Sequence, residues 1–403
     1  MSQTPPVVIV GAGPVGLALA LALIHQGLPV VVLEQRLQIP NDLRATTVQP
    51  PVLEHLGAWG VLDEALAAGR RVSQLQYWDW PRRLLLAELD YTLIEGDTRC
   101  PFRLHLPQAR LCEILLAAIE RTRPGTVRFG HKVTSVVLHD DRAIVTTQIH
   151  GGGEETFTTP RLCGADGGHS VVRQAMGIEL GDEGVADTFL ACTADLDVLP
   201  IIEARLSRAL APASYLYASQ DWALVMVMTD AVRFLFRAVP DPEVSLARDA
   251  INERMRRFLG AEIGGRLRGL GLYSVRQRVA PSWHQGPAAL LGDAAHGNLP
   301  VGGTAMNEGI LDAHHLAWAL AEGTPRAMDA YSTQRRSCAL SLEAQDSETW
   351  KALRARGIWR RFSRNQYLKR ISIHPVAARA HLLRLSMLED RIGGGAVPDL
   401  DHE

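Results

Sequence analysis

A strand, a glycine turn, a helix and a second strand follow one another at the start of this chain, and this unit constrains the fold more than any other feature. Residues 7–10 (VVIV) form a short apolar run, and GAGPVG follows at once. Residues 14–26 read as an alanine- and leucine-rich helix that ends at Gly27, and residues 29–33 return to a strand pattern. Two buried parallel strands joined by a helix predict an α/β domain.

The spacing of the glycines in this turn has a physical reason. Gly11 permits the tight turn, Gly13 lets the backbone approach a pyrophosphate, and Gly16 allows the helix to pack closely on the strand. The amino end of the helix offers N–H groups to phosphates, and Glu34, at the end of the second strand, can accept from ribose hydroxyls. The pattern predicts dinucleotide binding rather than a purely structural glycine turn, but it does not separate NAD from FAD.

Composition narrows the class of protein further. The chain has 403 residues, 47% of them hydrophobic, which is enough for two or three domains with buried cores. The net charge is -2, so no whole-chain field draws the protein to nucleic acid or to an acidic membrane. Five cysteines without a CxxC pair argue against a metal site or a disulfide framework and favour the cytoplasm. The longest strongly apolar run, residues 15–24, is about half of a membrane span, so we expect no transmembrane segment.

Two later segments are also rich in glycine. Residues 163–173 read CGADGGHSVVR, and residues 292–312 read GDAAHGNLPVGGTAMNEGILD. Together with GAGPVG, and in the same order, they resemble the three fingerprints of the class A flavoprotein monooxygenases, the para-hydroxybenzoate hydroxylase-like family of FAD-dependent aromatic hydroxylases. The resemblance covers roughly residues 5–345. It implies that the dinucleotide is FAD, and that NAD(P)H is a transient co-substrate because no second nucleotide-binding glycine motif is present.

The resemblance and the strand patterns together predict the domain organisation. Alternating runs such as YLYASQDWALVMVM indicate a separate, mostly antiparallel sheet. The expected fold class is α/β, with a Rossmann-like FAD-binding domain, an inserted antiparallel β-sheet substrate domain and a helical carboxyl-terminal tail. The FAD-binding domain is expected from residues 1–75, 102–180 and 281–345, the substrate domain from residues 76–101 and 181–280, and the helical tail from residues 346–403.

The third glycine-rich segment supplies candidate contacts to the flavin. Asp293 follows an apolar strand and can accept hydrogen bonds from a polyol, and the resemblance assigns it to the ribityl chain of FAD. Pro300, Gly302 and Gly303 precede an apolar helix, so their backbone N–H groups can converge on a flat polar edge. The resemblance implies that this loop lies along the flavin and that Asn307 also belongs to the cofactor site.

Three further residues match family positions that serve the cofactor. The resemblance places Asp166 in a motif that serves both FAD and the nicotinamide cofactor, although an aspartate there can equally cap a helix that begins near His169. Arg44 and Gln108 match positions that contact the flavin or its phosphates. The alternatives are a solvated surface arginine and a residue that merely starts a helix.

The antiparallel sheet supplies the remaining wall of the predicted site. Tyr215 and Tyr217 share one face of a strand, and Met226 and Phe236 lie in the two apolar runs that follow. We predict that these four residues contact an aromatic substrate, although such a face often packs only on the core of its own domain. An apolar cavity that accepts an aromatic ring is expected here.

The resemblance also implies the chemistry. NAD(P)H reduces FAD, O₂ adds to form a C4a-hydroperoxide, and an electron-rich aromatic or heteroaromatic carbon attacks its distal oxygen; the flavin does the difficult step, so no catalytic side chain is assigned. Baeyer–Villiger oxidation, epoxidation, a flavin reductase without oxygenation and a non-enzymatic FAD scaffold remain open. The protein is expected to be a monomer or a homodimer. Residues 351–370 hold eight basic residues and no acidic one, which suits either a solvated face or a weak peripheral contact with a membrane.

Overall fold

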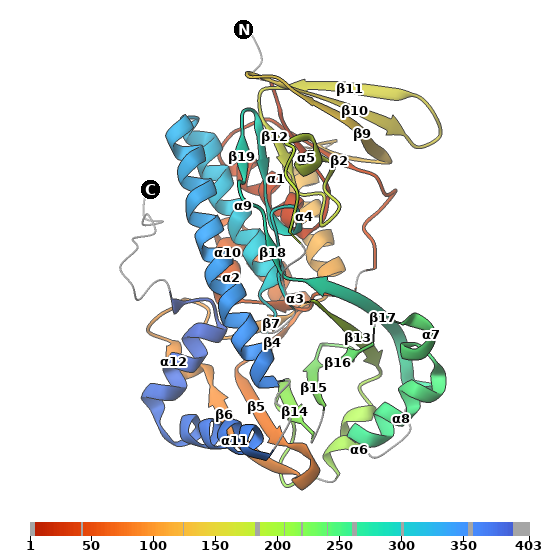
Figure 1. The fold of residues 1–403 in the computed structure, drawn as a ribbon, viewed down its shortest axis with the longest axis vertical. Helices are drawn as coiled ribbons and strands as arrows, with labels where there is room; N and C mark the ends of the chain where they lie inside the picture. The colour runs from red at the N-terminus through yellow and green to blue at the C-terminus, as the bar shows by residue number, and fades with distance from the viewer. Residues whose placement is uncertain are drawn as a thin grey trace.

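The structure is a computed structural model, and its elements fall into two stacked parts joined by crossing segments (Figure 1). It describes residues 5–41, 43–123, 125–181, 186–204, 206–218, 221–239, 241–259, 264–299, 302–353 and 358–389.

A mostly parallel sheet forms the centre of the first part. Within the described residues, its strands run in the order β19 (His284–Gln285), β20 (Ala288–Leu290), β12 (Leu162–Gly164), β1 (Val7–Val10), β2 (Val30–Glu34) and β8 (Val127–Phe129). In β1, Ile9 lies beside Val32 of β2 and Cys163 of β12, and all three residues are buried. Burial on both faces explains why these strands read as continuous apolar runs.

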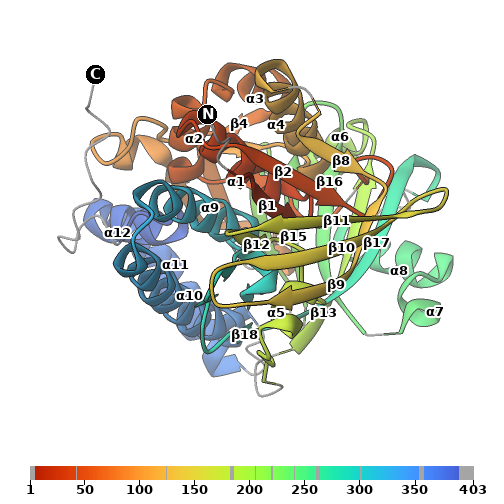
Figure 2. The same cartoon turned by 90° about the horizontal axis from the view of Figure 1, so that it is seen from above.

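Helices pack on this sheet and on one another (Figure 2). α1 (Pro14–His25) contacts β1, β2, α4 (Gln108–Thr122) and α9 (Ala305–Glu322). Every residue of α1 from Gly16 to Ile24 is buried, as expected for a helix surrounded by other elements. The long helix α10 (Pro325–Leu353) packs on α9.

Smaller elements complete this part. An antiparallel meander of β9 (His131–Leu138), β10 (Ala143–Ile149) and β11 (Glu154–Thr159) adds Val133 and Val145 to the same core. The other short elements are β3 (Thr47–Val48), β4 (Arg70–Val72), β7 (Arg103–His105), β18 (Arg278–Val279), β21 (His296–Gly297), α2 (Pro50–Ala58), α3 (Leu62–Ala68), α5 (Val171–Ala175) and the 3-10 helix η4 (Gly292–Ala294). β7 pairs with both β3 and β4, which ties these connecting segments together.

A second sheet dominates the other part. Among the residues that the structure describes, its strands run in the order β17 (Leu267–Arg276), β13 (Ala186–Ala194), β16 (Val232–Ala238), β15 (Trp222–Val227), β14 (Ala213–Tyr217), β5 (Gln74–Asp79) and β6 (Leu84–Asp90). All neighbours are antiparallel except β14 and β5. Here β5 and β6 come from a segment far earlier in the chain than the other strands. We propose that the two sheets are the centres of the two predicted domains.

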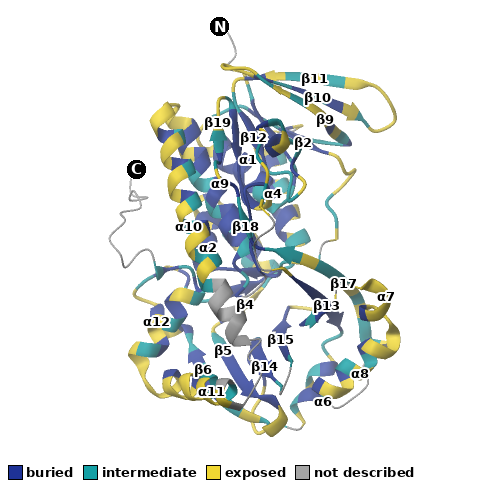
Figure 3. Ribbon diagram, in the orientation of Figure 1, coloured by how far each residue is buried: buried dark blue, intermediate teal, exposed yellow. Residues whose placement is uncertain are grey.

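Each face of the second sheet has its own core. The helices on one face are α6 (Val198–Glu203) and α8 (Arg248–Leu259), near α7 (Pro242–Ser245) and the 3-10 helices η1 (Trp80–Arg82) and η3 (Gly264–Arg266). Those at the β5–β6 end of the other face are α11 (Ile358–Ile373), α12 (Pro375–Leu385) and the 3-10 helix η2 (Tyr91–Ile94). Figure 3 shows these helices buried toward the sheet and exposed on the outside. The predicted α/β class, with an antiparallel sheet and helical carboxyl-terminal sequence, is confirmed.

Candidate active site

A cavity of about 680 Å³ lies where the two sheets meet, a size typical of small-molecule sites. One group of lining residues comes from the glycine-rich segments and their neighbours: Gly11, Gly13, Glu34, Arg44, Gln108, Asp166, Asp293, Gly302 and Gly303. Another group comes mostly from the second sheet: Arg103, His105, Ala213, Tyr215, Leu224, Met226, Leu235, Tyr273 and Asn298. The cavity therefore joins a turn built for a dinucleotide to a largely apolar chamber.

The amino-terminal glycines serve two different purposes. Gly11 has φ of +104°, and a Cβ there would lie 2.4 Å from the carbonyl oxygen of Ala165; a Cβ at Gly16 would lie 1.9 Å from that of Gly11. Around a Cβ at Gly13, by contrast, no atom would lie within 4 Å. Gly13 is also the N-cap of α1, where no side chain caps the helix. Gly11 and Gly16 let the chain pack closely. Gly13 leaves open space beside free N–H groups at the start of the helix, which suits a pyrophosphate.

Glu34 is held at the cavity by the backbone. Its Oε2 accepts a hydrogen bond from the N–H of Ala12 at 2.9 Å, and its Oε1 accepts from the N–H of Arg36 at 2.9 Å. Each carboxylate oxygen retains acceptor capacity, so both can still receive ribose hydroxyls. The position agrees with the predicted role, which stays a prediction.

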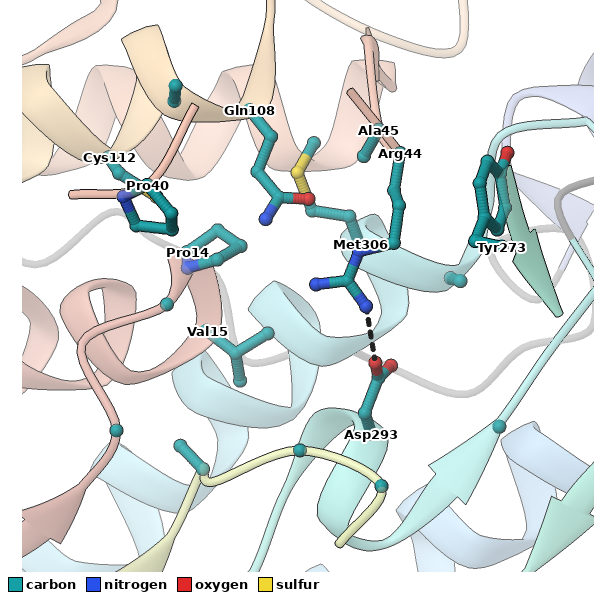
Figure 4. Close-up of a pocket in the computed structure, with 18 of the residues that line it drawn as sticks. Pro14, Val15, Pro40, Arg44, Ala45, Gln108, Cys112, Tyr273, Asp293 and Met306 are labelled. Carbon is teal, nitrogen blue, oxygen red and sulfur yellow. Dashed lines mark ion pairs between the residues drawn. The ribbon is translucent and has the colours of Figure 1, made fainter. Parts of the chain in front are cut away.

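Arg44, Gln108 and Asp293 point into the same space (Figure 4). Asp293 lies in η4, directly after β20, and its Oδ2 is 4.0 Å from Nη1 of Arg44. Both side chains are about half exposed, 53% for Arg44 and 55% for Asp293, so this ion pair is weak and open to competition. Gln108 is the first residue of α4, and its backbone N–H donates to the carbonyl of Ala45. The arrangement leaves polar side chains available to a ligand on two sides of the cavity.

The glycine loop before α9 runs along the cavity. Gly302 and Gly303 have φ of +78° and +71°, and a Cβ at Gly303 would lie 2.9 Å from Cβ of Thr47. Only glycine fits this backbone comfortably. Pro300, predicted to belong to the same loop, lies outside the described residues.

Asn307 requires a correction. Its side chain is fully buried and is not part of the cavity wall. Its Nδ2 donates to the carbonyls of Gly303 at 2.7 Å and Thr47 at 2.9 Å, and its Oδ1 accepts from the N–H of Gln49 at 2.8 Å. The side chain of Asn307 therefore fixes the glycine loop against β3 and does not line the cavity.

Asp166 caps a helix and also lines the cavity. Its Oδ2 accepts from the N–H groups of Val171 at 2.7 Å and Val172 at 3.3 Å, at the start of α5, whose N-cap is Ser170. Its Oδ1 is buried without a hydrogen-bond partner, and the residue lines the cavity. Burial raises the pKa of this carboxyl, partly offset by hydrogen bonds from Ser170 and the backbone. One oxygen thus caps a helix, and the other is the kind of orphaned acceptor that a ligand satisfies.

A buried ionic network joins β21, α9 and α10. Asp312 accepts from His296 Nε2 at 2.8 Å, from Arg335 Nε at 2.8 Å and from the N–H of Gly292 at 3.1 Å, and Arg335 also pairs with Glu308. Burial alone would raise the pKa of Asp312, but Arg335 and His296 outweigh it and lower the pKa to about 2. His296 therefore has the structural role that fits a buried imidazole.

The structure brings two of the four predicted substrate residues to the cavity. Tyr215 and Met226 line it, on the same face of the sheet as Leu224 and Leu235. Tyr217 lies further along β14, outside the cavity wall, where the guanidinium of Arg364 sits over its ring at 4.1 Å.

Phe236 also requires a correction. Residue 235 pairs with Leu224, so Leu235 faces the cavity and Phe236 faces the opposite side of the sheet. There it packs against Phe258 of α8, with ring centroids 5.3 Å apart. The alternation of side chains along a strand separates the two faces of the sheet, but it does not show which face meets the cavity.

Several polar residues of the wall were not predicted, among them Arg103, His105 and Asn298. Arg103 and His105 lie on β7, a strand of three residues that is too short to show a pattern. Asn298 follows β21, and both polar atoms of its side chain are buried without a partner. Asn298 lies in the third glycine-rich segment, shortly after GDAAH. That position was the one sequence feature that could have pointed to it as a site residue.

The comparisons with known proteins agree with this geometry. The family model described as "FAD binding domain" matches residues 4–346, most of the chain. The chain belongs to this family and is a class A FAD-dependent aromatic monooxygenase, as the three glycine-rich segments predicted.

Individual relatives make the likeness more specific. The para-nitrophenol 4-monooxygenase of Pseudomonas sp. (strain WBC-3) is 30% identical over 366 residues, 87% of this chain and 88% of that protein. The 6-methylpretetramide 4-monooxygenase of Streptomyces rimosus is 31% identical over 82% of this chain, which spans only 59% of that longer protein. The crystal structure of the p-nitrophenol 4-monooxygenase PnpA from Pseudomonas putida DLL-E4 superimposes with a TM-score of 0.88 at 26% identity, over 98% of this chain and 100% of that one.

Other expectations concern metals and membranes. Within the described residues, no cluster of histidine, cysteine and acidic side chains could hold a metal ion, and no helix combines the length and apolarity of a membrane span. The basic segment 351–370 lies partly outside the described residues. In its described part, Leu368 is buried, whereas Trp359 and Phe362 are 84% and 56% exposed. The peripheral membrane contact stays a prediction.

Proposed function

We propose that this protein uses NAD(P)H and O₂ to hydroxylate a small aromatic compound. The observation that carries the proposal is that a single cavity joins the glycine turn of the first part to the apolar wall of the second sheet. A relative named para-nitrophenol 4-monooxygenase, matched over most of both chains, supports a phenol as the substrate class.

The residues present fit FAD. Gly13 and the amino end of α1 would hold its pyrophosphate, Glu34 a ribose, Asp293 the ribityl chain, and the Gly302–Gly303 loop the edge of the ring system. Bound FAD would supply the transfer of electrons from NAD(P)H to O₂. The chain itself binds, orients and encloses the reactants.

The second sheet would hold the aromatic ring. Tyr215 is stacked on Tyr77 with ring centroids 5.2 Å apart, so its ring is fixed where it borders the cavity. Leu224, Met226 and Leu235 add aliphatic surface on the same wall, which excludes water from the reacting carbon. In the overall reaction, NAD(P)H supplies two electrons, one oxygen atom replaces the hydrogen on a ring carbon as a hydroxyl group, and the other oxygen leaves as water.

The decisive experiment separates hydroxylation from simple flavin reduction. Anaerobic reduction of the holoenzyme by NADH or NADPH should accelerate at least tenfold, about 1.4 kcal/mol of barrier, when an accepted phenol is present. Reoxidation under ¹⁸O₂ should then place one labelled atom in the product. Fast reduction without any ligand, and no labelled product across a panel of phenols, anilines and hydroxylated heteroaromatics, would favour a flavin reductase.

The state of the cysteines bears on where the protein is located. All five cysteines are free thiols, which suits the reducing cytoplasm. We propose a cytoplasmic monomer or homodimer, which analytical ultracentrifugation of the holoenzyme would decide.

A further inference from the structure

Arg103 is a buried charge on the wall of the cavity. Only 3% of the surface of Arg103 is exposed. Its Nη2 donates to the carbonyl of Leu385 at 3.2 Å, its guanidinium lies 5.7 Å from the ring centre of Tyr91, and its Nε has no hydrogen-bond partner. Within the described residues, no carboxylate pairs with it or lies among the groups that act on it electrostatically. Such a charge is costly to bury without a counter-ion.

The titratable groups around Arg103 do not supply the missing negative charge. Tyr77, Tyr91 and Tyr215 are its nearest such neighbours, and a tyrosine hydroxyl is neutral at neutral pH. On α12, His381 lies close to Arg103, and burial, aided by nearby arginines, lowers its pKa to about 4. Since that imidazole is neutral as well, the described residues supply no compensating negative charge for Arg103, which lines the cavity.

His105 lies beside Arg103 on the same face of β7, because residues two apart in a strand point the same way. Its Nδ1 is 3.0 Å from the carbonyl oxygen of Val227, so Nδ1 carries the proton and donates it to that oxygen. Nε2 is then an acceptor. Burial, together with Arg103 and two further arginines, lowers the pKa of His105 to about 4, which keeps the ring neutral.

We propose that Arg103 is the counter-ion of the substrate, which carries an anionic oxygen such as a phenolate, and that Nε2 of His105 accepts a hydrogen bond from a second, neutral hydroxyl or amino group of a substrate that has one. This inference rests on the proposed function only in taking the cavity as the substrate site. It makes Arg103 and His105 specificity-determining residues, while Tyr215 and its aliphatic neighbours hold the ring.

Binding of two matched probes tests the charge directly. 4-Nitrophenol ionises, whereas its ether 4-nitroanisole has the same ring and no acidic proton. Titration of the holoenzyme, followed by the flavin absorption, should show at least tenfold tighter binding of 4-nitrophenol, and the bound ligand should show the phenolate spectrum at a pH about one unit below that needed in water. Equal affinity for the two probes, or no binding of either, would overturn the proposal.

Variants assign the effect to the guanidinium. Arg103→Gln should lose the preference for 4-nitrophenol at least tenfold, and Arg103→Lys should keep most of it because the charge remains. Arg142→Gln, which removes an arginine that is 47% exposed on the β9–β10 hairpin, should leave it unchanged. His105→Phe should leave the binding of 4-nitrophenol nearly unchanged, because a phenolate has no hydrogen-bond donor for Nε2. It should weaken the binding of 4-nitrocatechol, whose second hydroxyl can donate, severalfold. A preference that survives Arg103→Gln would refute the assignment.

A stability measurement separates recognition from a structural role. Removing a buried charge that has no partner should leave thermal unfolding of the ligand-free holoenzyme unchanged or raise its midpoint, so Arg103→Met should be at least as stable as the parent. A fall of several degrees, combined with unchanged probe selectivity, would identify Arg103 as a structural residue. Because binding needs no turnover, selective binding without hydroxylation would defeat the proposed function alone, and hydroxylation without charge selectivity would defeat this inference alone.

Discussion

The two ends of the cavity are built on different principles. At the cofactor end, much of the wall is backbone, from the glycine turn at Gly11–Gly16, the amino end of α1 and the Gly302–Gly303 loop, with a few polar side chains such as Glu34 and Asp293 added to it. At the other end, side chains from separate strands form the wall, among them Tyr215 and Leu235. A backbone-built site depends on a few positions that tolerate no side chain, whereas a wall of side chains can change its ligand through single substitutions.

Two buried arginines show the same difference. Arg335, on α10, is paired with both Asp312 and Glu308. Arg103, on the substrate wall, has no carboxylate partner among the described residues. The first belongs to a closed network that stabilises the fold, and the second leaves its charge available to a ligand.

The largest effect on stability is expected when the buried ionic network around Asp312 loses its shared carboxylate. Asp312→Asn should lower the free energy of unfolding by about 3–5 kcal/mol, because it leaves Arg335 and His296 buried without their shared carboxylate. Urea unfolding at neutral pH measures the loss. The exposed control Asp141→Asn should stay within about 0.5 kcal/mol of the parent.

The pH dependence of the same residue has a defined sign. The pKa of Asp312 is lowered to about 2 in the folded protein, so its contribution is complete above about pH 4 and is lost as the pH falls toward 2. The stability difference between the parent and Asp312→Asn should therefore shrink over that range. A constant difference would show that the carboxylate does not carry it.

A pair of glycine substitutions tests the backbone-built end. Gly11→Ala should destabilise the fold by about 1–3 kcal/mol and abolish FAD retention, because the new Cβ meets Ala165 and φ is +104°. Gly13→Ala has φ of -71° and open space, so it should fold like the parent but bind FAD at least tenfold more weakly. Equal FAD affinity in Gly13→Ala would mean that no pyrophosphate approaches Gly13.

Removing the Glu34 carboxylate should weaken FAD binding by as much as Gly13→Ala does, or by less. We expect Glu34→Ala to weaken FAD binding by about 1–3 kcal/mol through unpaired ribose hydroxyls. Glu34→Gln, which keeps one acceptor oxygen and replaces the other with an NH₂ donor, is the matched control for the hydrogen bond that Glu34 accepts from Ala12. Fluorescence titration of the apoprotein with FAD gives both constants, and an unchanged value in Glu34→Ala removes this residue from the site.

The smallest effect should distinguish the two faces of the second sheet. Tyr215→Leu should raise the KM for the aromatic substrate by roughly fivefold, about 1 kcal/mol, with little loss of stability. Phe236→Leu should lower stability by about 1 kcal/mol and leave KM unchanged, because it packs on Phe258. The reverse pattern would place the substrate on the α8 side of the sheet.

Sequence patterns predicted much of the fold because the decisive contacts are local. The parallel strands β1 and β2, helix α1 and the turn between them all lie between Val7 and Glu34, and their spacing alone specifies the packing. Asn307 shows where this stops. It belongs to a recognised motif, but its amide is directed to Gly303 and Thr47, whose approach depends on how distant segments pack.

The amino-acid sequence by itself determined the α/β class and the dinucleotide turn, because these rest on short contiguous patterns with steric causes, and its three glycine-rich segments identified the FAD-dependent monooxygenase family by resemblance. Only the tertiary structure decided which face of the second sheet meets the cavity, that Leu235 and not Phe236 lines it, and that Arg103 has no carboxylate partner there among the described residues. A period of two residues defines two faces without ranking them. The absence of a counter-ion is a property of everything packed around a residue, which no local pattern contains.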